Sequence, residues 1–351
     1  MNKGAQIRRI AIFLFVAVFA QGVCHAQDDV QFTLFPWASS YYNAGAIGEQ
    51  NNTLCFTGIY NNKYLGWNDV YMQGDSLMKD KTAPQDIYFS LESYLKKLHG
   101  SLGVTFVNDI IGFYNNIGVK LGYSYKLRVG PGHLGIGAQI SLYNQKLKDS
   151  PSWRPIQTGD PVLDNLGEST MDLDFSLGLQ YKCDQWYAGI GVTQLASAFD
   201  KNRVLRLAGD KEYISRNPQM YFHGGYDWIV PANPNWELIP HAMVKTDFKT
   251  YQIDVMALVR YNGILWGGLG YRLNDAVSLI FGTRPFHNSS NIYLKGLEAA
   301  VSYGITANSL AYRANRSFGD VEVMIRYCFD IYKPEVFSGY GSTRNIYKNQ
   351  Y

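Results

Sequence analysis

The sequence has few of the features that usually identify a chemistry. Only four of its 351 residues are cysteine, and Cys55, Cys183 and Cys328 are the three that follow residue 26. An odd, widely spaced set predicts neither a disulfide framework nor a metal motif, so we expect each to be a small apolar side chain in a strand. After residue 26 no 18 consecutive residues are apolar, which excludes a membrane-spanning helix.

An excess of either charge is also missing. All 29 acidic residues follow Ala26, and so do all but three of the 32 basic residues, which leaves the rest of the chain neutral. A neutral chain lacks the basic surface by which proteins bind nucleic acid. The motifs H-E-x-x-H and G-x-S-x-G and paired Cys/His spacings are absent too, so we expect neither an enzyme nor a cofactor.

The first 26 residues have the order of a secretory signal peptide. A basic start is followed by the apolar run Ile10–Ala20, and Cys24-His25-Ala26 offers a cleavage site. An anchor helix would need a longer apolar run to cross a bilayer. Lipoprotein processing at Cys24 is the other alternative, but Val23 is larger than the residue that usually precedes such a cysteine. We therefore expect residues 1–26 to be removed and the mature chain to be exported.

The clearest pattern that is present is a long alternation of apolar and polar residues. Thirteen residues, Ile117 to Val129, alternate strictly, and after the turn signal Gly130-Pro131-Gly132 the residues from Leu134 to Tyr143 alternate again. A period of two indicates a strand with one apolar and one polar face. Strands of soluble sheets have about five or six residues, whereas a tilted strand needs roughly 9–11 to cross a bilayer. The hairpin therefore predicts membrane-crossing strands.

Fourteen segments of the chain alternate in this way. They predict an all-β fold, a transmembrane antiparallel β-barrel of about 14 strands of the outer-membrane type. A soluble sandwich would have shorter strands, and no period of about 40 to 50 residues suggests a propeller. The segments are 54–60, 87–94, 98–107, 116–129, 133–146, 170–183, 185–194, 219–229, 235–245, 251–261, 264–272, 275–283, 293–305 and 320–329.

The connections between these segments differ in length. Those that follow odd-numbered segments are mostly long: 61–86, 108–115, 147–169, 195–218 and 306–319. Those that follow even-numbered segments are mostly short, and outer-membrane barrels have long loops outside and short turns in the periplasm. We therefore expect a signal peptide at 1–26, an N-terminal extension at 27–52, an outer-membrane barrel at 53–330 and a periplasmic C-terminal tail at 331–351.

The N-terminal extension is too apolar for a solvated tail. We expect it to fold into the lumen or along the periplasmic rim, and its candidate plug residues are Phe32, Trp37, Tyr42, Asn43, Gly45 and Gly48. The strand register also predicts a charged lumen of both signs, formed by Lys120, Lys126, Arg128, Asp172, Asp174, Lys182, Glu298, Glu322 and Arg326. Mixed charge favours a solvated or cross-paired lumen, and an ion-selective pore is the alternative.

The same register predicts that His99, His223 and His241 face the lumen. A catalytic cluster and ordinary lumen or interface histidines are the two interpretations, and the absence of catalytic motifs favours the second. The C-terminal tail carries spaced aromatic residues and an arginine, which are the residues that anchor protein interfaces. The candidate partner-binding residues are Phe337, Tyr340, Arg344, Tyr347 and Tyr351, and the alternative is a disordered end.

Several short motifs occur in order along almost the whole mature chain. They are Gln31-Phe32-Thr33, Tyr42-Asn43-Ala44-Gly45-Ala46-Ile47-Gly48, Val107-Asn108-Asp109-Ile110-Ile111-Gly112, Leu121-Gly122-Tyr123-Ser124-Tyr125, Gly224-Gly225-Tyr226, Val244-Lys245-Thr246-Asp247 and Gly319-Asp320-Val321-Glu322-Val323. In these motifs the sequence resembles the PorP/SprF family of outer-membrane proteins of type IX secretion. The proline of the family's Y-N-P-A motif is missing, and the histidine that often precedes the glutamate of the last motif is absent as well.

The resemblance implies an integral protein in the outer membrane of a Gram-negative bacterium of the Bacteroidetes. It implies a role in exporting or anchoring cargo proteins with C-terminal sorting domains, including gliding adhesins. The implied partners are outer-membrane lipids, periplasmic ring components of the secretion machine, a peptidoglycan-binding protein and the cargo, with no nucleic acid. A general porin or solute channel is the alternative, although a simple porin needs neither the extension nor the tail.

Overall fold

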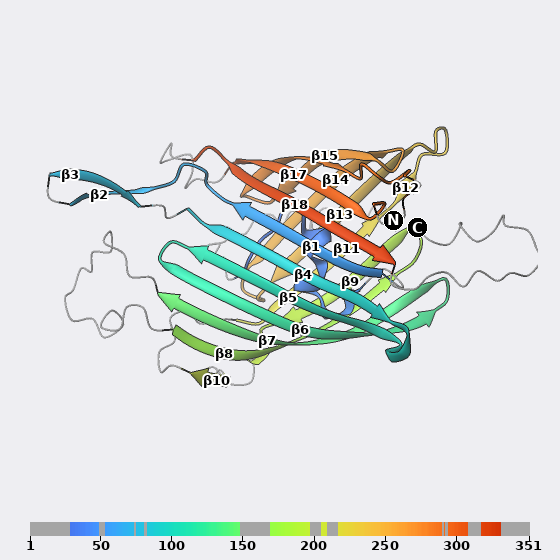
Figure 1. The fold of residues 1–351 in the computed structure, drawn as a ribbon, viewed down its shortest axis with the longest axis horizontal. Coiled ribbons are helices and arrows are strands. Elements are labelled where there is room, and N and C mark those ends of the chain that lie inside the picture. Colours follow the sequence, from blue (N-terminus) through green and yellow to red (C-terminus); the bar gives the residue numbers. More distant parts are fainter. Residues whose placement is uncertain are drawn as a thin grey trace, which may run out of the picture.

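The chain forms a closed antiparallel β-barrel in the computed structural model (Figure 1). The structure describes residues 29–48, 53–73, 75–80, 83–147, 169–196, 205–208, 217–289, 291, 294–307 and 317–330. Fourteen strands make the wall: β1 (Thr53–Asn62), β4 (Gln85–Leu95), β5 (Gly100–Ile111), β6 (Tyr114–Val129), β7 (Gly132–Leu147), β8 (Ser169–Lys182), β9 (Trp186–Thr193), β11 (Gln219–Tyr226), β13 (Trp236–Thr246), β14 (Tyr251–Tyr261), β15 (Leu265–Arg272), β16 (Ala276–Thr283), β17 (Leu297–Thr306) and β18 (Asp320–Asp330).

Each strand of the wall pairs with its sequence neighbour, and β1 pairs with β18 to close the ring. Two short strands are added to the wall: β10 (Leu205–Ala208) pairs with β8, and β12 (Trp228–Ile229) pairs with β13. A separate hairpin of β2 (Asp69–Gln73) and β3 (Ser76–Asp80) extends from one end of the barrel (Figure 1). The expected number of strands and their antiparallel order are confirmed.

The alternation of the sequence becomes an outer and an inner face. On neighbouring strands Leu121, Ile140 and Leu177 are 58%, 52% and 54% exposed. Their chain neighbours Lys120 and Ser141 are 0% exposed, because they face the lumen. No helix among the described residues is long and apolar enough to traverse a membrane.

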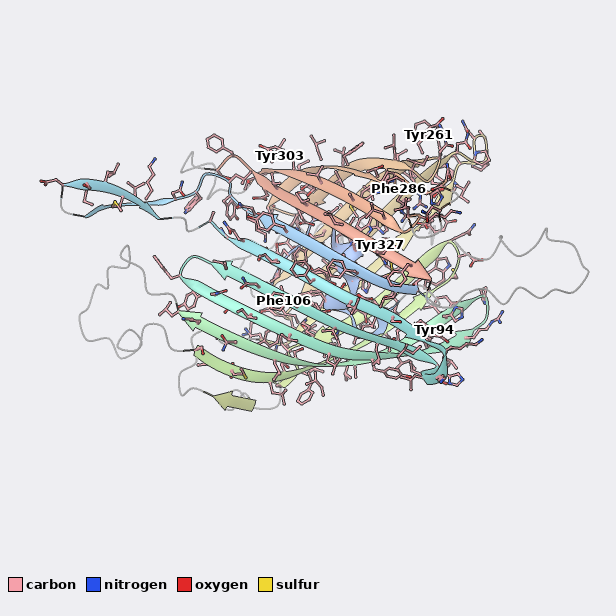
Figure 2. All side chains as sticks on the ribbon, viewed as in Figure 1. Tyr94, Phe106, Tyr261, Phe286, Tyr303 and Tyr327 are labelled. Carbon is pink, nitrogen blue, oxygen red and sulfur yellow. A yellow bond between two sulfur atoms is a disulfide. The ribbon has the colours of Figure 1, made fainter. Side chains whose placement is uncertain are left out.

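Exposed aromatic side chains gather near the two ends of the barrel. Tyr261 and Phe286 lie toward one end in Figure 2, and Tyr303 lies toward the other. Tyr and Trp are enriched where a membrane protein passes through the lipid headgroups, because one side of their rings is apolar and the other is polar. The outer surface is therefore an apolar belt with aromatic residues at its borders.

The two ends of the barrel differ in their connections. We call the end with the short connections between β6 and β7 and between β8 and β9 the turn end. We call the end from which the β2–β3 hairpin extends the loop end. The long loop expected at 108–115 is wrong, because β5 and β6 continue pairing up to Ile111 and Tyr114. Gly112, whose φ is 58°, then begins a tight turn.

His99 corrects another expectation. A short 3₁₀ helix, η3 (Lys96–Leu98), ends β4, and His99 follows with a φ of 50° in an exposed turn. Strand β5 begins only at Gly100, so the side chain of His99 is outside the lumen.

Pro240 lies within β13, opposite the interruption between β11 and β12, where a missing amide proton does not break the regular ladder.

The expectation that the cysteines form no disulfide is wrong. Cys55 of β1 and Cys328 of β18 are directly opposite each other, with Cα atoms 4.1 Å apart, and they form a disulfide. They are 273 residues apart in sequence, and only the closure of the barrel and its register bring them together. Cys183 is the free cysteine among the described residues. The disulfide links the first strand of the wall covalently to the last.

The outer face can be tested at Ile140, in the middle of β7. We expect Ile140→Arg to destabilise the folded barrel by about 2–4 kcal/mol, because it places a charge in the centre of the apolar belt. Ser141→Ala is the matched control, since the Ser141 hydroxyl faces the lumen and has no hydrogen-bond partner among the described residues. Heat-modifiability in gel electrophoresis would measure both, and equal losses would contradict the assigned faces.

The disulfide gives a second test. We expect Cys328→Ser to lower the stability of the barrel by about 2–5 kcal/mol, because the link restricts the unfolded chain. Cys183→Ser is the control and should leave the stability unchanged, since Cys183 is outside the disulfide. Unfolded, unreduced wild-type protein should react with a maleimide at a single mature cysteine, and reaction at all three would show that the disulfide is absent.

Candidate functional site

The lumen is occupied by the described N-terminal residues 29–48, which we call the inner segment (Figure 1). Its short helical turns are η1 (Phe35–Ala38), α2 (Ser39–Tyr42) and η2 (Ala44–Ala46). Pro36 stands in the first turn of η1, where its fixed φ suits a helix start. Gly48, the last described residue before β1, has a φ of 60°, a backbone conformation that favours glycine. Most of its residues are buried and the others are half-buried, so the segment fills the interior rather than lining it.

One side of the lumen wall is apolar and packs against the first half of the inner segment. Phe32, Leu34 and Phe35 are at most 2% exposed there. The buried apolar residues of the facing strands are Ile239, Met243, Met256, Leu258, Trp266, Ile280, Ala300 and Met324. These residues occupy lumen-facing positions that would be polar in a water-filled channel, so this half of the interior is a packed hydrophobic core.

Trp37 joins this apolar contact to a partly buried ion pair. Its ring stacks on the ring of Trp266, with centroids 4.7 Å apart and planes 10° apart. Its Nε1 donates a hydrogen bond of 3.2 Å to Glu298, which also pairs with Arg284 at 3.2 Å. The hydrogen bond therefore satisfies the indole N–H while the ring packs against Trp266.

Glu322 of β18 holds the beginning of the inner segment. One carboxylate oxygen accepts the backbone N–H of Thr33 and the other accepts that of Leu34, each at 2.8 Å. Two charge-assisted hydrogen bonds to consecutive amides fix the path of the chain at this point. A glutamate expected to be part of a charged lumen thus binds the backbone of the inner segment.

On the opposite side of the wall, several glycines face the inner segment. A Cβ atom on Gly137 would lie 2.1 Å from the carbonyl oxygen of Ala44, and one on Gly178 would lie 1.9 Å from Asn43 Oδ1. Similarly close contacts, of 2.2 Å, would occur at Gly135 and Gly191. These lumen-facing glycines of β7, β8 and β9 form a glycine cradle, in which any larger side chain would push the inner segment away.

Asn43 lies in this cradle and is fully buried. Its Oδ1 accepts the N–H of Gly45 at 2.8 Å, which caps the turn η2. Its Nδ2 lies 2.9 Å from the carbonyl oxygen of Leu179 and 2.9 Å from Nε2 of His223. The asparagine therefore connects the inner segment to β8 and β11, and His223 has a structural partner.

Lysines of β6 bind the inner segment from the same side. Lys120 is fully buried, and its Nζ donates to the carbonyl oxygen of Tyr41 at 2.9 Å while lying 3.6 Å from the centre of that ring. Lys126 donates to the carbonyl oxygen of Gly45 at 2.9 Å. Their positive charges thus bind to main-chain oxygens and an aromatic face of the segment.

Asp29 starts the described part of the inner segment and holds two tyrosines. Tyr221 of β11 donates to Asp29 Oδ2 at 2.7 Å, and Tyr41 donates to Oδ1. Both tyrosines are at most 1% exposed. This carboxylate was not among the expected site residues, because a single aspartate in a short polar stretch gives no signal in the sequence.

The structure places the remaining expected residues in several surroundings. Asp172 and Asp174 are buried on β8, and Asp174 accepts the N–H of Ala196 at 2.9 Å. Arg326 is half-buried beside the disulfide, 3.9 Å from Cys55 Sγ. Arg128 is exposed at the turn end of β6, opposite His133, which corrects its expected place within the lumen. The tail residues Phe337, Tyr340, Arg344, Tyr347 and Tyr351 lie outside the described residues.

Comparison with known proteins gives one family and several barrels of low identity. The family described as type IX secretion system membrane protein PorP/SprF matches residues 24–327. The outer membrane protein Omp33 of Acinetobacter baumannii is 8% identical, with 80% of this chain and 100% of that chain covered and a TM-score of 0.41. The toluene transporter TodX of P. putida is 11% identical, with 83% and 93% covered and a TM-score of 0.47. No curated protein sequence matches significantly.

The match to PorP/SprF spans most of the chain, including the inner segment and nearly the whole wall. The closed barrel with its apolar outer belt agrees with the membrane location in the family's description. The protein is integral to the outer membrane, as the sequence motifs predicted. The chain belongs to the PorP/SprF family of type IX secretion system membrane proteins.

Proposed function

We propose that the protein is a non-enzymatic part of the type IX secretion machine that binds other proteins and whose own N-terminal segment plugs its barrel. Family membership over residues 24–327 supports the place in the machine. The packed inner segment supports the plug, because both walls of the lumen contact it through buried groups. In this proposal the barrel is a scaffold in the outer membrane rather than a route for solutes.

The lumen histidines support a role other than catalysis. His223 contacts Asn43, and His241 Nδ1 lies 3.0 Å from the hydroxyl of Tyr187. The ring of Phe35 packs against His241 with centroids 6.4 Å apart. Both imidazoles therefore make structural contacts inside the barrel, which supports the interpretation that they are ordinary lumen histidines.

The partners we propose are periplasmic ring components, a peptidoglycan-binding protein and cargo with a C-terminal sorting domain. The turn end of the barrel would face the periplasm, and the tail that begins at residue 331 would leave from the same end, since β18 ends there. The tail carries Phe337, Tyr340, Arg344, Tyr347 and Tyr351. Aromatic residues and arginine of this kind anchor protein interfaces.

A porin is the second candidate, and conductance distinguishes the two. The intact protein should conduct little in a planar bilayer, and Gly178→Ala should raise the conductance, because the new Cβ would meet Asn43 Oδ1. Gly270→Ala is the control, since it also faces the lumen but its Cβ would come no closer than 3.4 Å to a neighbour. A large, steady conductance of the intact protein would favour the porin.

The partner-binding role is tested with the tail. A variant without Ser342–Tyr351 should assemble a normal barrel, while cargo secretion falls and periplasmic partners no longer co-purify from native membranes. Tyr347→Ala with Tyr351→Ala should have the same effect in weaker form, and Ser338→Ala with Ser342→Ala is the control in the same segment. Unchanged secretion and unchanged co-purification would exclude the tail as the docking element.

A further inference from the structure

A row of polar side chains crosses the lumen wall near the loop end. Its members are register partners on eight neighbouring strands, and all of them are buried: Ser302, Glu322, Asn61, Asp86, Asp109, Asn116, Gln145 and Thr170. Glu322 already binds the inner segment. The centre of the row, on β4, β5 and β6, has no function in the contacts described above.

Two carboxyl groups meet at this centre. Asp86 and Asp109 are 3% and 8% exposed, they are register partners on β4 and β5, and their carboxyl groups interact with each other. Neither forms an ion pair with a described residue, although the charge of Lys63 acts on both from the loop end of β1. Two buried carboxylates in contact repel each other unless a cation or a proton lies between them.

Polar atoms without partners surround this pair. Asp109 Oδ1 and Asn116 Oδ1 are buried and have no hydrogen-bond partner among the described residues. Both residues are only 8% exposed. Asn116 Nδ2 donates to Asp109 Oδ2 at 3.4 Å, which places the amide against the carboxylate. The centre of the row therefore has more oxygen acceptors than donors, as a site for a cation would have.

The inner segment reaches the same row. Asn61 Nδ2 donates to Asp86 Oδ2 at 3.0 Å and to the backbone oxygen of Gln31 at 3.1 Å. Gln31 Oε1 is also buried without a partner among the described residues. Anything bound between Asp86 and Asp109 would therefore lie one hydrogen-bonded residue away from the start of the inner segment.

We propose that Asp86, Asp109 and Asn116 bind a calcium ion. Calcium takes six to eight oxygen ligands in flexible geometry, whereas magnesium demands near-ideal octahedral geometry. The described residues contain no group of three or more His, Cys, Asp or Glu that could hold a metal, so amide oxygens and water must complete the ligands. The ion neutralises the charge of the carboxylate pair and stabilises the barrel wall near the start of the inner segment.

The test uses the full-length barrel in detergent, stripped of divalent ions with EDTA and titrated with calcium chloride in a calorimeter. We expect saturable binding and a higher temperature of heat-modifiability when calcium is present. Asp86→Asn and Asp109→Asn should lose both effects. Asp184→Asn is the control and should keep both, because Asp184 is exposed in the turn between β8 and β9.

Two results would overturn the calcium site. One is wild-type protein that shows neither saturable binding nor a calcium-dependent change in heat-modifiability. The other is an Asp109→Asn variant that still binds calcium as tightly as the wild type. If the aspartate variants fail to assemble, titration of the wild-type protein with calcium and with magnesium still tests the site. Saturable binding that is tighter for calcium than for magnesium supports the site, and no saturable binding of calcium overturns it. The site is independent of the proposed function, because no step of the test measures secretion or conductance.

Discussion

The structure depends on the close approach of one stretch of backbone to the barrel wall. Residues 43–45 lie against Gly137 and Gly178 at distances that leave no room for a Cβ atom. Such contact is possible only where several neighbouring strands lack side chains on their inner face. The glycine cradle therefore determines where the inner segment lies, and the buried asparagine and lysines then bind the main chain that the cradle admits.

The opposite wall contacts the inner segment through apolar side chains, which fill the wide interior. A barrel of fourteen strands is wider than the eight-stranded barrels that wall side chains alone can fill. Here the first half of the inner segment supplies the missing volume, and Met256, Leu258 and Trp266 meet it with apolar surface. The interior thus combines a hydrophobic core on one side with direct backbone contact on the other.

The seam between the first and last strands has several independent ties. The ladder pairs Thr53 to Asn62 with β18, and Cys55–Cys328 adds a covalent bond. The inner segment adds hydrogen bonds to both seam strands, through Asn61 of β1 and Glu322 of β18. Closure of the barrel and placement of the N-terminal segment are therefore linked, because the same two strands take part in both.

The sequence by itself determined the strands, their number and their outer face, because a period of two is a local property that each segment carries. It also predicted that Phe32 and its neighbours would be buried, because the N-terminal extension is too apolar for a solvated tail. Only the tertiary structure decided the disulfide, the contacts of Asn43 and Glu322, and the meaning of Met256 and Leu258 on a face expected to be polar. These depend on which residues of distant strands meet across a closed ring, and alternation specifies the face of a residue without its partner.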